Sequence, residues 1–240
     1  MDIFELSHGS EEELIPIKTL NDKEVEKVIK HYNLDIDDFY YVKGRLYKYC
    51  YMKDYVFVEI YDMSIDGFEK IMIIETINYR KDYFKKTLED KNYGNFFCMI
   101  DKPRRLYWFY QLLNEMSKEE AKFIFKYIYT SMEYGFKEIP EEIIEEYLYN
   151  DSLDRNQFDE IVTIYRGEGS KSNTYDKAYS WTLDRKIAVF FANRFNKNNN
   201  NKRLYKAEIK REDIIDCIEN RDESEIIVLP KNLMNVERLM

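Results

Sequence analysis

The period of the hydrophobic residues changes from about 3.6 to 2 near residue 158, and this change sets the architecture. Before it, in 105–149, apolar residues recur at helical spacing in three consecutive stretches. The second stretch opens on a capping-box pattern, Ser117 to Glu120, and the third follows Pro140, which the first turn of a helix tolerates. We therefore predict three consecutive helices that pack into a small lobe.

Beyond residue 158 apolar and polar residues alternate, which is typical of strands. A helix over 184–195 interrupts the alternation, and a short helix or turn is predicted through 214–217. The predicted strands cover 161–166, 179–182, 204–210 and 223–229. This part of the chain is therefore expected to be a small sheet with one main helix.

The first part of the chain has weaker patterns. Residues 39–74 are rich in Tyr, Val, Phe and Ile with partial alternation, which indicates two or three short antiparallel strands. Stretches at 21–34 and 80–90 have helical spacing. We predict an α+β protein with three regions. They are an N-terminal mixed α/β region of unknown role over 1–104, the helical lobe over 105–158, and a C-terminal core over 159–240.

The charge is distributed unevenly along the sequence. Residues 1–150 carry 21 basic and 30 acidic side chains, whereas residues 151–240 carry 16 of each. The net charge of −9 therefore belongs to the first part. An acidic surface repels phosphates, which makes nucleic acid a less favoured partner than protein. The 45% of hydrophobic residues excludes a disordered chain.

The cysteines give no sign of a structural bridge or a metal site. Cys50, Cys98 and Cys217 are odd in number and far apart, so neither a disulfide framework nor a zinc cluster is indicated. The sequence also has no secretory signal and no run of 18 apolar residues. We expect a cytoplasmic protein, in the producing or infected cell, with no metal and no membrane partner.

Several polar residues stand on the predicted strands of the core. Residues i and i+2 of a strand face the same side. Ser180 and Thr182 therefore share one face of their strand, and Glu223 and Glu225 share one face of theirs. Arg166 ends another strand. A lone Glu-x-Glu is usually a solvated strand face, and Ser-x-Thr or a single Arg is no more specific. The order and context of the three motifs carry the signal.

At these residues the sequence resembles the ADP-ribosyltransferase family, in its class with an arginine, a Ser-x-Thr/Ser motif and a Glu-x-Glu motif. The matching segments are IYRG at 164–167, YSWT at 179–182, AVFFANRF at 188–195 and RDESEIIVLP at 221–230. They occur in the family's order and cover about a third of the chain. The resemblance implies a split antiparallel sheet that binds NAD.

The resemblance also implies a role for each matching residue. Arg166 would hold the phosphate and ribose side of NAD, and the backbone of Gly167 would lie against the nicotinamide amide. Ser180 and Thr182 would brace the cleft, with Ser180 bonded to the catalytic carboxylate. That carboxylate would be Glu225. The first glutamate of the motif, Glu223, would position the acceptor, which in this class is arginine.

The expected function is mono-ADP-ribosyl transfer from NAD to an arginine of a host protein, by a bacterial or phage effector such as a toxin or a defence inhibitor. Trp181 departs from the small residue that the family usually has there, and it is expected in the core. Two alternatives remain open. One is ADP-ribosylation of nucleic acid or hydrolysis of NAD, and the other is a non-enzymatic acidic binding module that mimics a partner.

Overall fold

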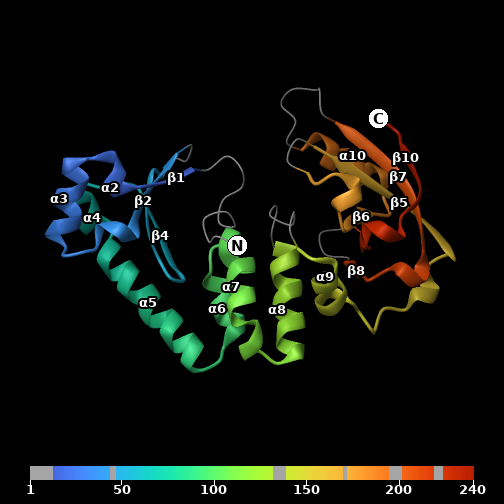
Figure 1. Ribbon diagram of the computed structural model, residues 1–240, viewed down its shortest axis with the longest axis horizontal. Helices are drawn as coiled ribbons and strands as arrows, with labels where there is room; N and C mark the ends of the chain where they lie inside the picture. Colours follow the sequence, from blue (N-terminus) through green and yellow to red (C-terminus); the bar gives the residue numbers. More distant parts are fainter. Residues whose placement is uncertain (1–12, 44–46, 132–138, 170–171, 195–201, 219–223) are drawn as a thin grey trace. The chain divides into compact units, whose positions relative to one another are not determined.

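The computed structural model describes residues 13–43, 47–131, 139–169, 172–194, 202–218 and 224–240 of the chain. These residues form nine α-helices and two antiparallel sheets, so the protein has the α+β composition that the sequence predicts (Figure 1). The chain divides into two compact units, residues 1–133 and residues 134–240, here called unit 1 and unit 2.

The three helices predicted over 105–149 are present, and they are divided between the units. Helices α7 (Arg105–Leu112) and α8 (Lys118–Ser131) belong to unit 1, whereas α9 (Glu141–Leu148) belongs to unit 2. The predicted capping box is confirmed at the start of α8. The Ser117 amide donates to Glu120 Oε2 at 3.1 Å, and the Glu120 amide donates to Ser117 Oγ at 3.2 Å.

Unit 1 contains a four-stranded antiparallel sheet in the order β1-β2-β3-β4. The strands are β1 (Glu13–Pro16), β2 (Phe39–Lys43), β3 (Tyr49–Lys53) and β4 (Val56–Ile60). The last three confirm the short strands predicted over 39–74. Besides α7 and α8, the helices of unit 1 are α2 (Ile17–Leu20), α3 (Lys23–His31), α4 (Ile65–Lys70), α5 (Ile73–Glu89) and α6 (Tyr93–Met99).

Aromatic side chains form the contacts between the later helices of unit 1. Phe84 of α5, Phe96 of α6, Phe109 of α7 and Phe125 of α8 are all fully buried. The ring centroids of Phe84 and Phe96 lie 5.3 Å apart, and those of Phe109 and Phe125 lie 5.1 Å apart. Rings at this separation add attraction beyond the burial of their area. These four helices therefore share one aromatic core.

Unit 2 contains a six-stranded antiparallel sheet in the order β10-β7-β5-β6-β9-β8. The strands are β5 (Ile161–Glu168), β6 (Ser180–Thr182), β7 (Arg203–Lys210), β8 (Asp216–Ile218), β9 (Glu225–Ile227) and β10 (Met234–Arg238). One face carries an apolar core that includes Ile164, Trp181, Ala207 and Ile226. Helix α10 (Arg185–Asn193) packs against β5.

The sequence prediction is wrong for one strand and omits others. The segment over 214–217 was predicted as a short helix or turn, but 216–218 form β8, an edge strand that pairs with β9. The edge strands β1 and β10 were not predicted; four of the five residues of β10 are exposed, so it has no alternation to detect. Among the described residues, no helix has the length and apolar character needed to cross a bilayer.

Candidate functional site

The strands that carry the predicted polar residues are immediate neighbours in the sheet of unit 2. Strand β6 lies between β5 and β9. Along the sequence, α10, β7 and β8 separate β6 from β9. The residues on these strands are Arg166 and Gly167 of β5, Ser180 and Thr182 of β6, and Glu225 of β9. Tertiary folding therefore brings the three sequence motifs to one part of the sheet.

The pairing register places Thr182 beside Glu225. Thr182 is the Cα partner of Tyr165 in β5 on one side and of Glu225 in β9 on the other. Directly opposite residues of antiparallel strands point to the same face, with Cβ atoms about 4.5–5.5 Å apart. Ser180 lies two residues before Thr182 and faces the same side. Two hydroxyls and one carboxyl group, with Thr182 buried and the other two half-buried, therefore share this face.

The residue before Glu225 is tied to the end of β6. The Leu183 amide donates to the Ser224 carbonyl at 3.2 Å, which extends the contact between β6 and β9 beyond their last paired residues. Ser224 has a φ of +41°, a left-handed conformation that is uncommon for residues other than glycine. Glu223, predicted to position the acceptor, lies outside the described residues. The structure therefore fixes the second glutamate of the motif and gives no position for the first.

Gly167 allows α10 to lie directly on β5. It faces the same side as Tyr165, and therefore the same side as Thr182. A Cβ atom on Gly167 would lie 1.8 Å from the Ala188 carbonyl oxygen and 2.6 Å from the Ala192 amide nitrogen. Both atoms belong to the backbone of α10, so no side-chain rotation relieves the overlap. The glycine is thus explained by the close approach of helix and strand.

Replacing Gly167 with alanine is expected to destabilise unit 2 by about 1–3 kcal/mol, because α10 must move away from the sheet. Chemical denaturation of the two proteins measures this difference. The matched control is Gly94→Ala, where the nearest neighbour of the added Cβ is 3.9 Å away. Gly94 lies in α6, so alanine there is expected to be neutral or slightly stabilising. Equal stability of wild type and Gly167→Ala would contradict this packing.

Arg166 does not share the face of Thr182 and Glu225. It follows Tyr165 on a regularly paired strand, so its side chain projects to the opposite side, toward the row of Trp181. Its Nη1 donates to the Ser180 carbonyl at 2.6 Å and its Nη2 donates to the Asn173 carbonyl at 3.0 Å. The guanidinium thus links β5 to β6 and to the segment before it.

Glu168 is a buried carboxyl group that the sequence analysis missed. Its side chain is 4% exposed, with Oε1 3.9 Å from Arg166 Nε and Oε2 3.8 Å from Arg203 Nη1. Burial raises the pKa of Glu168, and the two guanidinium groups only partly oppose this shift. Oε1 accepts no hydrogen bond from the residues that the structure describes. The Arg-x-Glu spacing on a strand was the available signal, since it puts both side chains on one face.

The raised pKa of Glu168 predicts a pH-dependent stability. The folded protein holds this proton more tightly than the unfolded chain, so the contribution of Glu168 to stability falls as pH rises above the ordinary value of 4.5. Glu168→Gln imitates the protonated form and removes this dependence. Relative to wild type, the variant is therefore expected to gain stability as the pH rises above 4.5.

The measurement is the free energy of unfolding at several pH values for both proteins, in a Trp108→Phe background. Trp108 and Trp181 are the two tryptophans of the chain, one in each unit, so Trp181 fluorescence then follows unit 2 alone. A difference between the proteins that shrinks as pH rises would show that the two arginines outweigh the burial of Glu168.

Trp181 is in the core, as predicted. It is 2% exposed and packs in the apolar cluster with Ile164 and Ile226, on the face opposite to Thr182. Its Nε1 donates to no described residue. Trp181 therefore supports the sheet from behind and does not line the face that carries Glu225.

Neither a known protein family, nor a curated protein, nor a solved structure matches this chain. The chemistry available to the site therefore follows from its residues. The face with Glu225 offers a carboxyl group that can carry a negative charge or accept a proton. Two hydroxyl groups beside it can donate hydrogen bonds to it. This combination is suited to stabilising positive charge on a bound substrate.

Proposed function

We propose that unit 2 is an NAD-dependent mono-ADP-ribosyltransferase. The observation that supports the proposal most strongly is the register of β6 and β9, which puts Ser180, Thr182 and Glu225 on one face of the sheet. The motifs that resemble the family in sequence are thus carried by three adjacent strands.

In the proposed reaction Glu225 stabilises the charge that develops on the ribose. As the bond from C1′ to the nicotinamide nitrogen breaks, its electron pair leaves with nicotinamide and the sugar becomes positive. An ionised carboxylate near the ribose 2′-hydroxyl then stabilises the transition state more than the ground state. The hydroxyls of Ser180 and Thr182 orient the carboxylate by donating to it.

Arg166 acts as a positioning residue in this proposal. Its guanidinium donates to the Ser180 carbonyl from the opposite face, and in this way fixes the strand that bears both hydroxyls. This differs from the direct hold on phosphate that the resemblance implies. The described residues on the Glu225 face therefore suit the ribose of NAD, and the pyrophosphate requires other groups.

The acceptor completes the reaction by forming a bond to C1′. We propose an arginine guanidinium on a protein, which must lose a proton as its nitrogen attacks. Glu223 of the Glu-x-Glu motif would take that proton and hold the guanidinium. The same resemblance leads us to propose a cytoplasmic bacterial or phage effector, with a host protein as its target.

The test is incubation of purified full-length protein with NAD labelled in the adenylate and with lysate of a bacterial host. We expect label on macromolecules that survives nuclease and is released by protease. Label that survives protease and disappears with nuclease would replace the protein acceptor with nucleic acid. Free ADP-ribose alone would identify a hydrolase. Absence of both NAD binding and labelling would overturn the proposal in favour of a binding module.

A further inference from the structure

A hollow of about 720 Å³ opens in unit 1, and none of its lining residues is assigned to the proposed reaction. Its walls come from strand β4, the turn between α4 and α5 with the start of α5, and the segment over 99–103. Its lining mixes apolar side chains, Ile71 and Met99 among them, with polar and charged ones in about equal measure. Sites for small molecules typically have about 300–1,000 Å³, so the hollow is large enough for one.

Two cations line this hollow, Arg80 of α5 and the exposed Lys102. Two acidic residues also line it. The carboxylate of Asp101 is neutralised by Arg104, whose Nε donates to Asp101 Oδ1 at 2.7 Å. The other acid, Glu59, is exposed. Counting Arg80, Lys102 and Glu59 leaves one net positive charge, which suits a ligand with a single negative charge.

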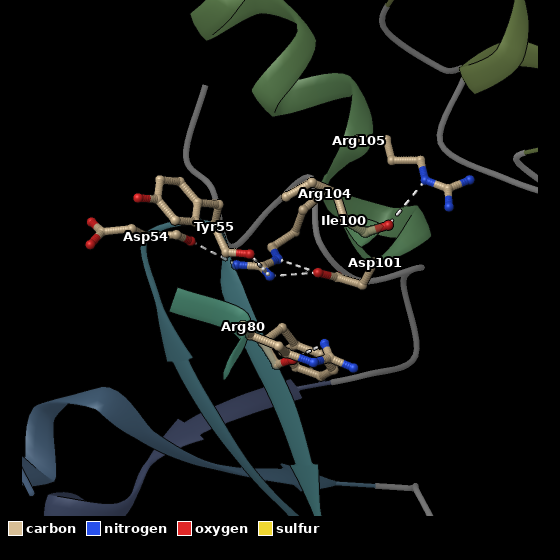
Figure 2. Close-up of polar contacts among 8 residues, drawn as sticks. Asp54, Tyr55, Arg80, Ile100, Asp101, Arg104 and Arg105 are labelled. Atoms are coloured by element: carbon tan, nitrogen blue, oxygen red, sulfur yellow. Dashed lines mark hydrogen bonds and ion pairs between the residues drawn. The ribbon is translucent and has the colours of Figure 1, made fainter. Parts of the chain in front are cut away.

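The guanidinium of Arg80 is held in place by the fold. Arg80 Nη1 donates to the Phe57 carbonyl of β4, and Figure 2 shows the guanidinium beside that strand. The neighbouring Arg104 is fully buried and donates to the carbonyls of Asp54 at 2.9 Å and Tyr55 at 3.2 Å. A fixed side chain loses less conformational entropy when a ligand binds, so Arg80 is prepared to bind a charged group.

We propose that this hollow binds a small amphipathic organic anion. One carboxylate or similar monoanionic group contacts Arg80 and Lys102, and an unbranched or aromatic apolar body covers Ile71 and Met99. The charged contact fixes the orientation of the ligand, and burial of its apolar body adds to the affinity. This binding site is independent of the proposed reaction in unit 2.

The experiment uses full-length protein and displacement of the fluorescent aromatic sulfonate ANS by octanoate or by octanol. ANS is expected to bind saturably, and octanoate is expected to displace it at lower concentration than octanol does. Lys102→Gln and Arg80→Lys are expected to weaken octanoate binding by about 3- to 10-fold, because each alters a charged contact, while octanol binding stays the same.

The matched control is Lys85→Gln, which removes an exposed cation of α5, the helix that also carries Arg80. Lys85 does not line the hollow, and its Nζ lies 3.9 Å from Glu89 Oε1. This variant should bind both ligands as wild type does. Circular dichroism of each variant confirms that unit 1 is folded. The proposal is overturned if ANS shows no saturable binding, if octanol and octanoate compete equally, or if Lys85→Gln weakens octanoate as much as Lys102→Gln does.

Discussion

Replacing Glu225 with glutamine is expected to lower NAD-dependent labelling by about 10²- to 10³-fold, the usual effect of removing one preorganised electrostatic group from an active site. Glutamine has nearly the same size and can still contact Thr182 on the neighbouring strand, so the sheet should persist. Only the negative charge is lost, and with it the stabilisation of the positive ribose. Initial rates of label incorporation and of nicotinamide release measure the effect.

The control for this experiment is Glu237→Gln on β10. Glu237 is exposed and lies on an edge strand at the far side of the sheet from β9, so its loss should leave both rates unchanged. Thermal unfolding of both variants checks that the sheet is intact. Equal labelling by wild type and Glu225→Gln would remove Glu225 from the proposed chemistry, even if the protein were active.

The elements that the sequence predicts correctly are those whose signals are local. The helix α8 is one of them, because Ser117 and Glu120 satisfy each other's backbone groups without help from the rest of the chain. Strand β5 is another, since Val162 and Ile164 alternate with more exposed residues. Patterns of this kind depend on three or four neighbouring residues, which the sequence displays directly.

The short edge strands could not be predicted for the same reason. Strand β8 has only three residues, and its conformation depends on pairing of Cys217 with Ile226 of β9. Strand β1 also has few residues and pairs with β2. Partners supplied by distant segments override local preference in such strands, so a turn or short helix was an equally good local interpretation of 214–217.

The candidate site shows what a strand pattern leaves undetermined. Alternation within one strand predicts that Ser180 and Thr182 share a face. It does not predict which side chains of β5 lie on that same side of the sheet. That relation is set by the pairing of Tyr165 with Thr182. A shift of one residue would put Arg166 on the side of Glu225, because every side chain of a strand changes face with such a shift. Register is a tertiary property.

Replacing Asp101 with alanine is expected to destabilise unit 1 by about 3–5 kcal/mol, the usual cost of leaving a buried charge without its partner. Arg104 is fully buried, and Asp101 is its anionic partner among the described residues, with an N···O distance of 2.5 Å (Figure 2). Without the carboxylate, the guanidinium retains the carbonyls of Asp54 and Tyr55 and the ring of Phe57. Neutral acceptors do not balance a full charge in the interior.

Denaturant unfolding in a Trp181→Phe background measures this loss, because Trp108 then reports only unit 1. The double variant Asp101→Ala with Arg104→Met provides the control, since removal of both charges should recover part of the lost stability. The linkage joins the turn after β3 to the start of α7, so the single variant should also loosen the contact between these two segments. A single variant as stable as wild type would show that water reaches Arg104 and that the ion pair does not hold the two elements together.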